Sequence, residues 1–167
     1  MTATQLLAEA FDRIASLVSD LTEGADEAEL ARRPADTGNS PAWLVWHLTR
    51  VQDDHVSELA GREQVWTSQG FADRFDLPFE AEATGYGQSD SEVASVRVDP
   101  QRLAAYHRAV HAMTAQFLDS ASDADLDRVV DDSFDPPVTA GARLVSVVAD
   151  DLQHAGQAAY ALGLDDR

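Results

Sequence analysis

The sequence predicts an all-α fold: a four-helix bundle with a long, partly helical crossover between its second and third long helices. Four stretches repeat apolar residues at helical spacing, and no stretch shows the polar–apolar alternation typical of a strand. Two of these stretches begin at a residue that commonly caps a helix. The chain has 167 residues, enough for one core, so we expect a single domain over residues 1–167.

The first two long helices are predicted over residues 4–23 and 41–60. Ser40 is a suitable N-cap for the second, because a proline follows it at the first helical position, and Gly61 marks its end. A turn, a short helix and a loop connect the two. The second helix is one of the most apolar elements of the chain. Its apolar residues are Trp43, Leu44, Trp46, Leu48, Val51, Val56 and Leu59.

The crossover, residues 62–99, is the least regular part of the chain. It contains glycines and a proline, but its aromatic residues can bury enough area to order it. We expect short helices near residues 69–76 and 89–95, and we interpret the glycine–tyrosine–glycine triplet at 85–87 only as a turn. The aromatic residues are Trp66, Phe71, Phe75, Phe79 and Tyr86.

The last two long helices follow the crossover. The third is predicted from Pro100 to about residue 119. A short capped helix and a loop ending at Pro136-Pro137 then lead to the fourth helix. We expect this helix to run from an N-cap at Thr139 to about residue 162, before Gly163.

Composition excludes several classes of function. The chain has 12 basic and 30 acidic residues, a formal charge of −18, which disfavours binding to nucleic acids and to anionic membranes. It has no cysteine, so disulfides, thiolate metal ligands and a cysteine nucleophile are absent from it. No apolar run is long enough to span a membrane, and the first residues do not resemble a secretory signal, so we expect a cytoplasmic protein.

Three residues on two predicted helices form the strongest candidate site. Asp150 and His154 are four residues apart on the fourth helix, so their side chains lie on one face and can bind one ion. His47 lies within the Trp-rich second helix, and a bundle can bring it to the same place. Two imidazoles and a carboxylate suit zinc, nickel, iron or manganese, with water in the open positions.

Simpler interpretations exist for the same residues. A histidine in an apolar helix is usually a hydrogen-bonded core residue, and an aspartate four residues before a histidine is often only a surface pair. The apolar neighbours favour the metal interpretation, because burial of an unpaired Asp150 is costly and a cation removes that cost. Pairing of Asp150 with His154 or with Arg143 is the alternative.

Other polar residues have less support. His107 and His111, also four residues apart, are expected at a solvated or boundary position beside the apolar stripe of the third helix. Four further residues are candidates for contacts with substrate or with the metal ligands: Asp54, His55, Tyr106 and Gln157. Known phosphate-binding, hydrolase and metalloprotease motifs are absent.

Two stretches resemble the DinB-like superfamily of metal-binding four-helix bundles: SPAWLVWHLTRVQDDHV at 40–56 and VVADDLQHAGQAAYALG at 147–163. The resemblance extends over nearly the whole chain. It implies that His47, Asp150 and His154 bind a divalent metal. A carboxylate at position 150 resembles the mycothiol-dependent maleylpyruvate isomerases, and the chain is also similar to DUF664-type proteins described as mycothiol transferases.

The resemblance implies a zinc- or nickel-dependent enzyme that uses a low-molecular-weight thiol such as mycothiol as cosubstrate. The reaction would be S-transfer to a small electrophile or a thiol-assisted isomerisation, and a homodimer is common among similar bundles. A metallohydrolase, in which a metal-bound water attacks with Asp54 as general base, is a second hypothesis. A non-enzymatic dimeric metal-binding or interaction module is the third.

Overall fold

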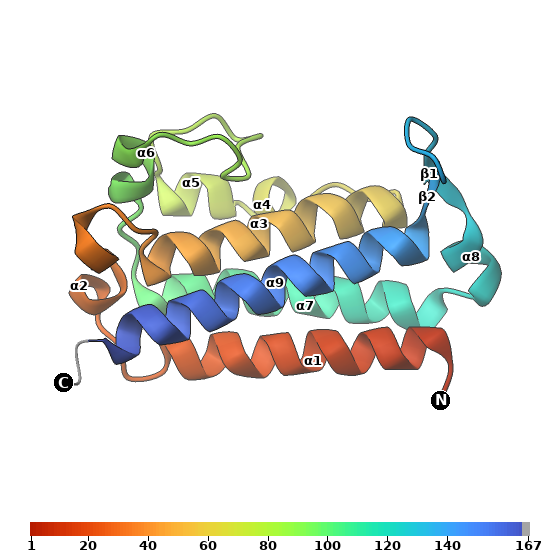
Figure 1. Ribbon diagram of the computed structural model, residues 1–167, viewed down its shortest axis with the longest axis horizontal. Coiled ribbons are helices and arrows are strands. Elements are labelled where there is room, and N and C mark those ends of the chain that lie inside the picture. Colours follow the sequence, from red (N-terminus) through yellow and green to blue (C-terminus); the bar gives the residue numbers. More distant parts are fainter. Residues whose placement is uncertain (165–167) are drawn as a thin grey trace.

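The computed structural model describes residues 1–164, without the side chain of residue 36, and consists mainly of four long helices lying side by side (Figure 1). These are α1 (Ala3–Thr22), α3 (Pro41–Ala60), α7 (Pro100–Ser120) and α9 (Ala140–Gly163). Helix α3 packs most extensively against α9, and α1 against α7. Contacts of α3 with α7 and of α1 with α9 close the bundle. The predicted all-α four-helix bundle is confirmed.

Side-chain caps define where the long helices begin. The hydroxyl of Ser40 accepts the backbone N–H of Trp43, and Thr139 accepts that of Ala142. At the other end of α3, Gly61 adopts the left-handed conformation that commonly terminates a helix. The predicted boundaries of the long helices therefore lie within about two residues of those observed, as is usual where caps are strong.

Helix α3 is the most buried element, with every residue from 41 to 53 buried. It packs against α9, α7 and the crossover, so it has no broad solvent face. Polar residues of α3 must therefore find partners inside the protein. The largest fully buried side chains of the core are Trp46, Arg50, Tyr106, Phe11, Ile14, Leu30, Leu44, Leu48, Leu103 and Leu144.

The crossover contains three short helices: α4 (Val65–Ser68), α5 (Phe71–Phe75) and α6 (Asp90–Ser95). The helix expected near 69–76 is α5, which is separated from α4 by Gly70 in a left-handed conformation. Aromatic rings of α4 and α5 pack around Tyr106 of α7, with ring centroids 4.9 to 5.7 Å from it. This packing fastens the crossover to the bundle.

Two short strands were not predicted. Strands β1 (Val129–Asp131) and β2 (Val138–Thr139) pair antiparallel beyond α8 (Asp123–Asp127), at the end of the bundle where α9 begins. The expectation that the chain lacks strands is wrong here. Strands of two or three residues are too short to show the alternation of polar and apolar residues by which a strand is recognised in a sequence. Between α1 and α3 lie α2 (Glu27–Leu30) and the 3₁₀ turn η1 (Pro34–Asp36).

The long helices show no candidate for a membrane span. Within residues 1–164, none has an apolar stretch long enough to cross a bilayer.

Candidate metal centre

Helices α3 and α9 bring the three predicted ligands together. His47, Asp150 and His154 each offer a ligand atom, and these atoms lie within 4.8 Å of one another. His47 is 3% exposed, whereas the side chains of Asp150 and His154 are partly exposed, so the group opens toward solvent on its α9 side. No other set of three His, Asp or Glu side chains within residues 1–164 converges in this way. The group is called the α3–α9 triad below.

Hydrogen bonds fix the ring tautomers of both histidines. Nδ1 of His47 lies 2.5 Å from the carbonyl oxygen of Thr84, and Nδ1 of His154 lies 2.9 Å from Oε1 of Gln157. Both oxygens can only accept, so each Nδ1 carries the proton it donates. Nε2 of each ring is then the atom available to a cation, as in metal-binding histidines whose other nitrogen is held by a carbonyl. Gln157 is thus an orienting residue for His154.

The three side chains of the triad differ in charge. Burial lowers the pKa of His47, and the neighbouring His154 lowers it further, so His47 is neutral at physiological pH. Asp150, with Oδ1 3.5 Å from Nε2 of His154, favours a proton on that nitrogen and raises the pKa of His154, so a bound cation would displace this proton. Burial opposes the ionisation of Asp150, but the hydrogen bond and charge of His154, with the charge of His47, leave the Asp150 pKa below its ordinary value. The carboxylate is therefore ionised.

The donor set fits a divalent transition metal. Oδ2 of Asp150 is buried and has no hydrogen-bond partner among the described residues, although buried carboxylate oxygens are rarely left without one. Oδ1 of the same carboxylate lies 3.5 Å from Nε2 of His154. A cation between the three side chains would satisfy the unpartnered oxygen. Two imidazoles and one carboxylate suit zinc, nickel or iron and leave positions for another ligand.

The crossover forms the outer wall of the triad. The Trp43 ring stacks on His47 with centroids 4.6 Å apart, and Tyr86 meets His47 edge-on at 5.2 Å. The backbone of Gly85 lies so close that a Cβ there would be 2.5 Å from Nδ1 of His47. The interpretation of residues 85–87 as only a turn is therefore corrected. The tyrosine between two glycines was the sequence feature that could have indicated a special role, but its position over His47 follows only from the fold.

A buried arginine holds this part of the crossover in place. Arg50 lies one turn after His47 on α3, and its guanidinium donates to the carbonyl oxygens of Ala83 at 3.1 Å and Ala81 at 3.4 Å. It also donates to Oε1 of Gln64 at 2.8 Å. These carbonyls immediately precede Thr84, which orients His47. Arg50 was not predicted from the sequence, because the residues around it in the helix do not indicate which distant residues it will bind.

The other proposed contact residues lie at varying distances from the triad. Asp54 and His55 lie about two helical turns along α3 from His47. Asp54 accepts from Nε2 of Gln64 at 2.6 Å, and Nδ1 of His55 lies 3.3 Å from the guanidinium of Arg143. Burial and Arg143 lower the pKa of His55.

Tyr106 is not beside the triad. It is fully buried, and its hydroxyl donates to Oδ2 of Asp53 at 2.8 Å. The same carboxylate accepts the backbone N–H groups of Val65 and Trp66 at 2.9 and 2.8 Å, which caps the start of α4. Tyr106 and Asp53 therefore anchor the crossover on the bundle.

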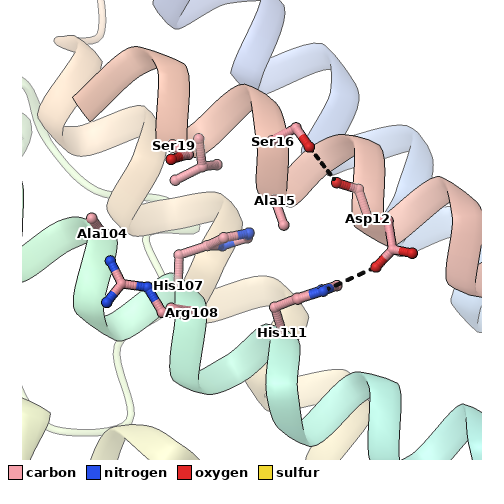
Figure 2. Close-up of a pocket in the computed structure, with 9 residues that line it drawn as sticks. Asp12, Ala15, Ser16, Ser19, Ala104, His107, Arg108 and His111 are labelled. Atoms are coloured by element: carbon pink, nitrogen blue, oxygen red, sulfur yellow. Dashed lines mark hydrogen bonds and ion pairs between the residues drawn. The ribbon is translucent and has the colours of Figure 1, made fainter. Parts of the chain in front are cut away.

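The histidine pair of α7 occupies a different cleft, between α1 and α7 (Figure 2). Its volume is about 420 Å³. His111 lies at the boundary, as expected, with Nε2 3.1 Å from Asp12, but His107 is 2% exposed and its Nδ1 meets Thr49 Oγ1 of α3 at 3.1 Å. The expectation of a solvated or boundary His107 is corrected, because α7 packs against both α1 and α3 and buries a wider arc of its surface.

Comparisons with known proteins agree with this architecture. The chain is similar to a conserved protein of Enterococcus faecalis whose crystal structure is known: the two are 34% identical, with a TM-score of 0.90 over 97% of this chain and 96% of that chain. Among curated proteins, none matches. The sequence model of the DinB superfamily matches residues 10–158, which is most of the chain. The chain therefore belongs to the DinB superfamily.

Proposed function

We propose that this protein is a divalent-metal-dependent enzyme in which a small thiol reacts with a small electrophile. The observation that carries the proposal is the α3–α9 triad, in which one ring nitrogen from each histidine and an ionised carboxylate lie within 4.8 Å and one carboxylate oxygen has no partner among the described residues. The DinB superfamily, which includes metal-binding enzymes, supports it. Zinc and nickel are the metals we expect for this donor set.

Each residue has a defined part in the proposed reaction. His47, Asp150 and His154 would hold the cation, while Thr84 and Gln157 keep Nε2 of the two histidines directed at it. A bound divalent cation lowers the pKa of a coordinated thiol, so that thiolate is available near neutral pH. The partly exposed side of the triad, toward α9, is where the thiol and the electrophile would enter.

The thiol must come from a separate molecule, because the chain contains no cysteine. A mycothiol-type thiol fits the resemblance of the ligand set to the mycothiol-dependent isomerases. Transfer of the thiol to the electrophile, or reversible addition that permits an isomerisation, would both use the same attack by thiolate on carbon.

Hydrolysis is the second candidate reaction. It is favoured by Asp54, a carboxylate with a side chain 41% exposed on the same helix as His47, because a hydrolase needs a general base near the reacting water. Asp54 lies about two helical turns from His47. This separation makes it harder for Asp54 to contact a small substrate bound at the triad, so hydrolysis is second to thiol transfer.

The first test is metal content after purification without an affinity tag or chelator. We expect about one zinc or nickel ion per chain in the wild type and loss of that ion in His47→Ala and in His154→Ala. His111→Ala is a matched control, since it removes an imidazole from the α1–α7 cleft and should retain the metal. Absence of metal, together with failure to bind added Zn²⁺ or Ni²⁺, would leave the interaction module as the better hypothesis.

A second assay separates the two reactions. The metal-loaded protein is incubated with 1-chloro-2,4-dinitrobenzene in the presence and absence of 2-mercaptoethanol, and with p-nitrophenyl acetate without thiol. Thiol-dependent arylation that disappears in His47→Ala supports the proposed function. Thiol-independent ester hydrolysis that disappears in the same variant supports the hydrolase instead.

A further inference from the structure

We propose that Tyr86 contacts the bound small molecule and donates a hydrogen bond from its hydroxyl to the anionic atom held at the open side of the α3–α9 triad. This inference rests on the proposed function, because it concerns the thiolate that the metal would bind. It assigns a substrate-contacting residue on the crossover, outside the three ligands.

The position of Tyr86 is fixed by its backbone. Thr84 accepts a hydrogen bond from His47, and Gln88 accepts one from the indole N–H of Trp43 at 2.7 Å. The residues on both sides of the 85–87 triplet are therefore attached to helix α3. Gly85 has a φ of +107°, and its backbone touches the His47 ring. Only glycine adopts this conformation easily. The chain therefore directs the next side chain, Tyr86, over the ligand His47.

The Tyr86 side chain is available to a ligand. It is 66% exposed although it touches the nearly buried His47, with their ring centroids 5.2 Å apart. Its hydroxyl makes no hydrogen bond to any of the residues that the structure describes. A tyrosine hydroxyl is a donor at neutral pH, so the group is free to donate to a bound anion.

The hydroxyl of Tyr86 is within electrostatic reach of charged side chains on both α3 and α9. The carboxylates that act on it are those of Asp150, Asp151 and Asp54, and the guanidinium that acts on it is that of Arg143. Asp150 is a member of the triad, while Asp54 and Arg143 lie further along the same pair of helices.

Tyr160 provides a comparison within the chain, because it is 70% exposed on α9 and, among the described residues, no hydrogen bond or ring contact joins it to a triad ligand. It serves as the matched control for a tyrosine on the surface.

The test uses the Co²⁺-substituted full-length protein and 2-mercaptoethanol as the thiol. Metal content is measured first in the wild type, Tyr86→Phe, Tyr86→Ala and Tyr160→Phe. Thiol binding is then titrated through the sulfur-to-cobalt charge-transfer band. We expect equal cobalt content in all four proteins, a thiol Kd raised about tenfold in Tyr86→Phe, and a Kd within about twofold of wild type in Tyr160→Phe.

The band position distinguishes a direct contact from a structural effect. A hydrogen bond to sulfur stabilises its lone pairs, so its loss in Tyr86→Phe should move the charge-transfer band to longer wavelength. An unchanged Kd and band in Tyr86→Phe would overturn the proposal, and so would equal weakening in Tyr160→Phe. Failure of the wild type to bind cobalt, or to bind thiol once loaded, would instead overturn the proposed function.

Discussion

Replacement of Gly85 by alanine tests whether the crossover positions His47. The added Cβ would lie 2.5 Å from Nδ1 of His47 and 3.1 Å from Cζ2 of Trp43, and the residue has a φ of +107°. A side chain at positive φ costs about 1–2 kcal/mol. Relief of the overlap adds about 1–3 kcal/mol, as in other overpacked sites. The expected loss of unfolding free energy is about 2–5 kcal/mol.

Gly87→Ala separates the two contributions. Gly87 also has a positive φ, of +71°, but a Cβ there would meet nothing within 4 Å. We expect this variant to lose only the conformational term, about 1–2 kcal/mol. The difference between the two variants therefore measures the contact with the His47 and Trp43 rings.

Urea unfolding of the two variants gives the stability difference, and competition with a zinc chelator gives the effect on the site. Gly85→Ala should weaken zinc binding about 10–100-fold, because His47 must move from its hydrogen bond with Thr84. Gly87→Ala should bind zinc as the wild type does. Equal stability and equal zinc affinity in the two variants would refute the idea that the crossover positions His47.

Three further predictions concern polar side chains of the bundle and of the triad. Burial and His111 lower the pKa of His107 to about 3 in the folded protein, so as the pH falls this imidazole is protonated in the unfolded chain before it is protonated in the folded one. Acid therefore favours unfolding, and between pH 7 and pH 5 the wild type should lose about 2 kcal/mol more unfolding free energy than His107→Gln. Asp53→Ala should lower the urea-unfolding free energy by about 3–5 kcal/mol, because it removes the carboxylate paired with the buried Arg50 guanidinium and leaves the first N–H groups of α4 without their acceptor. In the metal-free protein, Asp150→Asn should lower the His154 pKa measured by NMR, since the bond to this carboxylate raises it.

Clear outcomes would contradict these expectations. Parallel pH profiles for the wild type and His107→Gln would mean that the His107 imidazole is not buried as a neutral group. An Asp53→Ala variant as stable as Asp54→Ala would remove the anchoring role of Asp53, since Asp54 is its partly exposed neighbour. A His154 pKa that does not change in Asp150→Asn would show that the Asp150 carboxylate does not raise it.

Local rules predicted the features that depend on one helix. Ser40 and Gly61 act within a few residues of chain, so the limits of α3 follow from hydrogen bonding and backbone conformation at its ends. The spacing of Asp150 and His154 follows equally from helix geometry. The presence of His47 beside them required only that α3 and α9 be neighbours, which a four-helix bundle permits.

The features that sequence reasoning missed depend on contacts between distant segments. His107 is buried because two helices, not one, cover that side of α7. Tyr86 lies over the triad because Thr84, Gly85 and Gln88 contact α3 more than thirty-five residues away in the chain. The sequence of residues 62–99 has no periodic pattern that indicates the face of the bundle to which this segment attaches. From the sequence alone, Tyr86 between two glycines is therefore indistinguishable from a tyrosine in an ordinary surface turn.

The position of Arg50 has a consequence for the kinetics of ligand exchange. Detachment of the crossover would break the hydrogen bonds from the fully buried Arg50 guanidinium to the carbonyl oxygens of Ala81 and Ala83. Slow opening of this whole segment is therefore a poor route to the triad. The triad is partly exposed on its α9 side, so a small molecule can reach it with side-chain motions of picoseconds to nanoseconds. Association should accordingly be rapid and occur in a single phase, without a preceding conformational step.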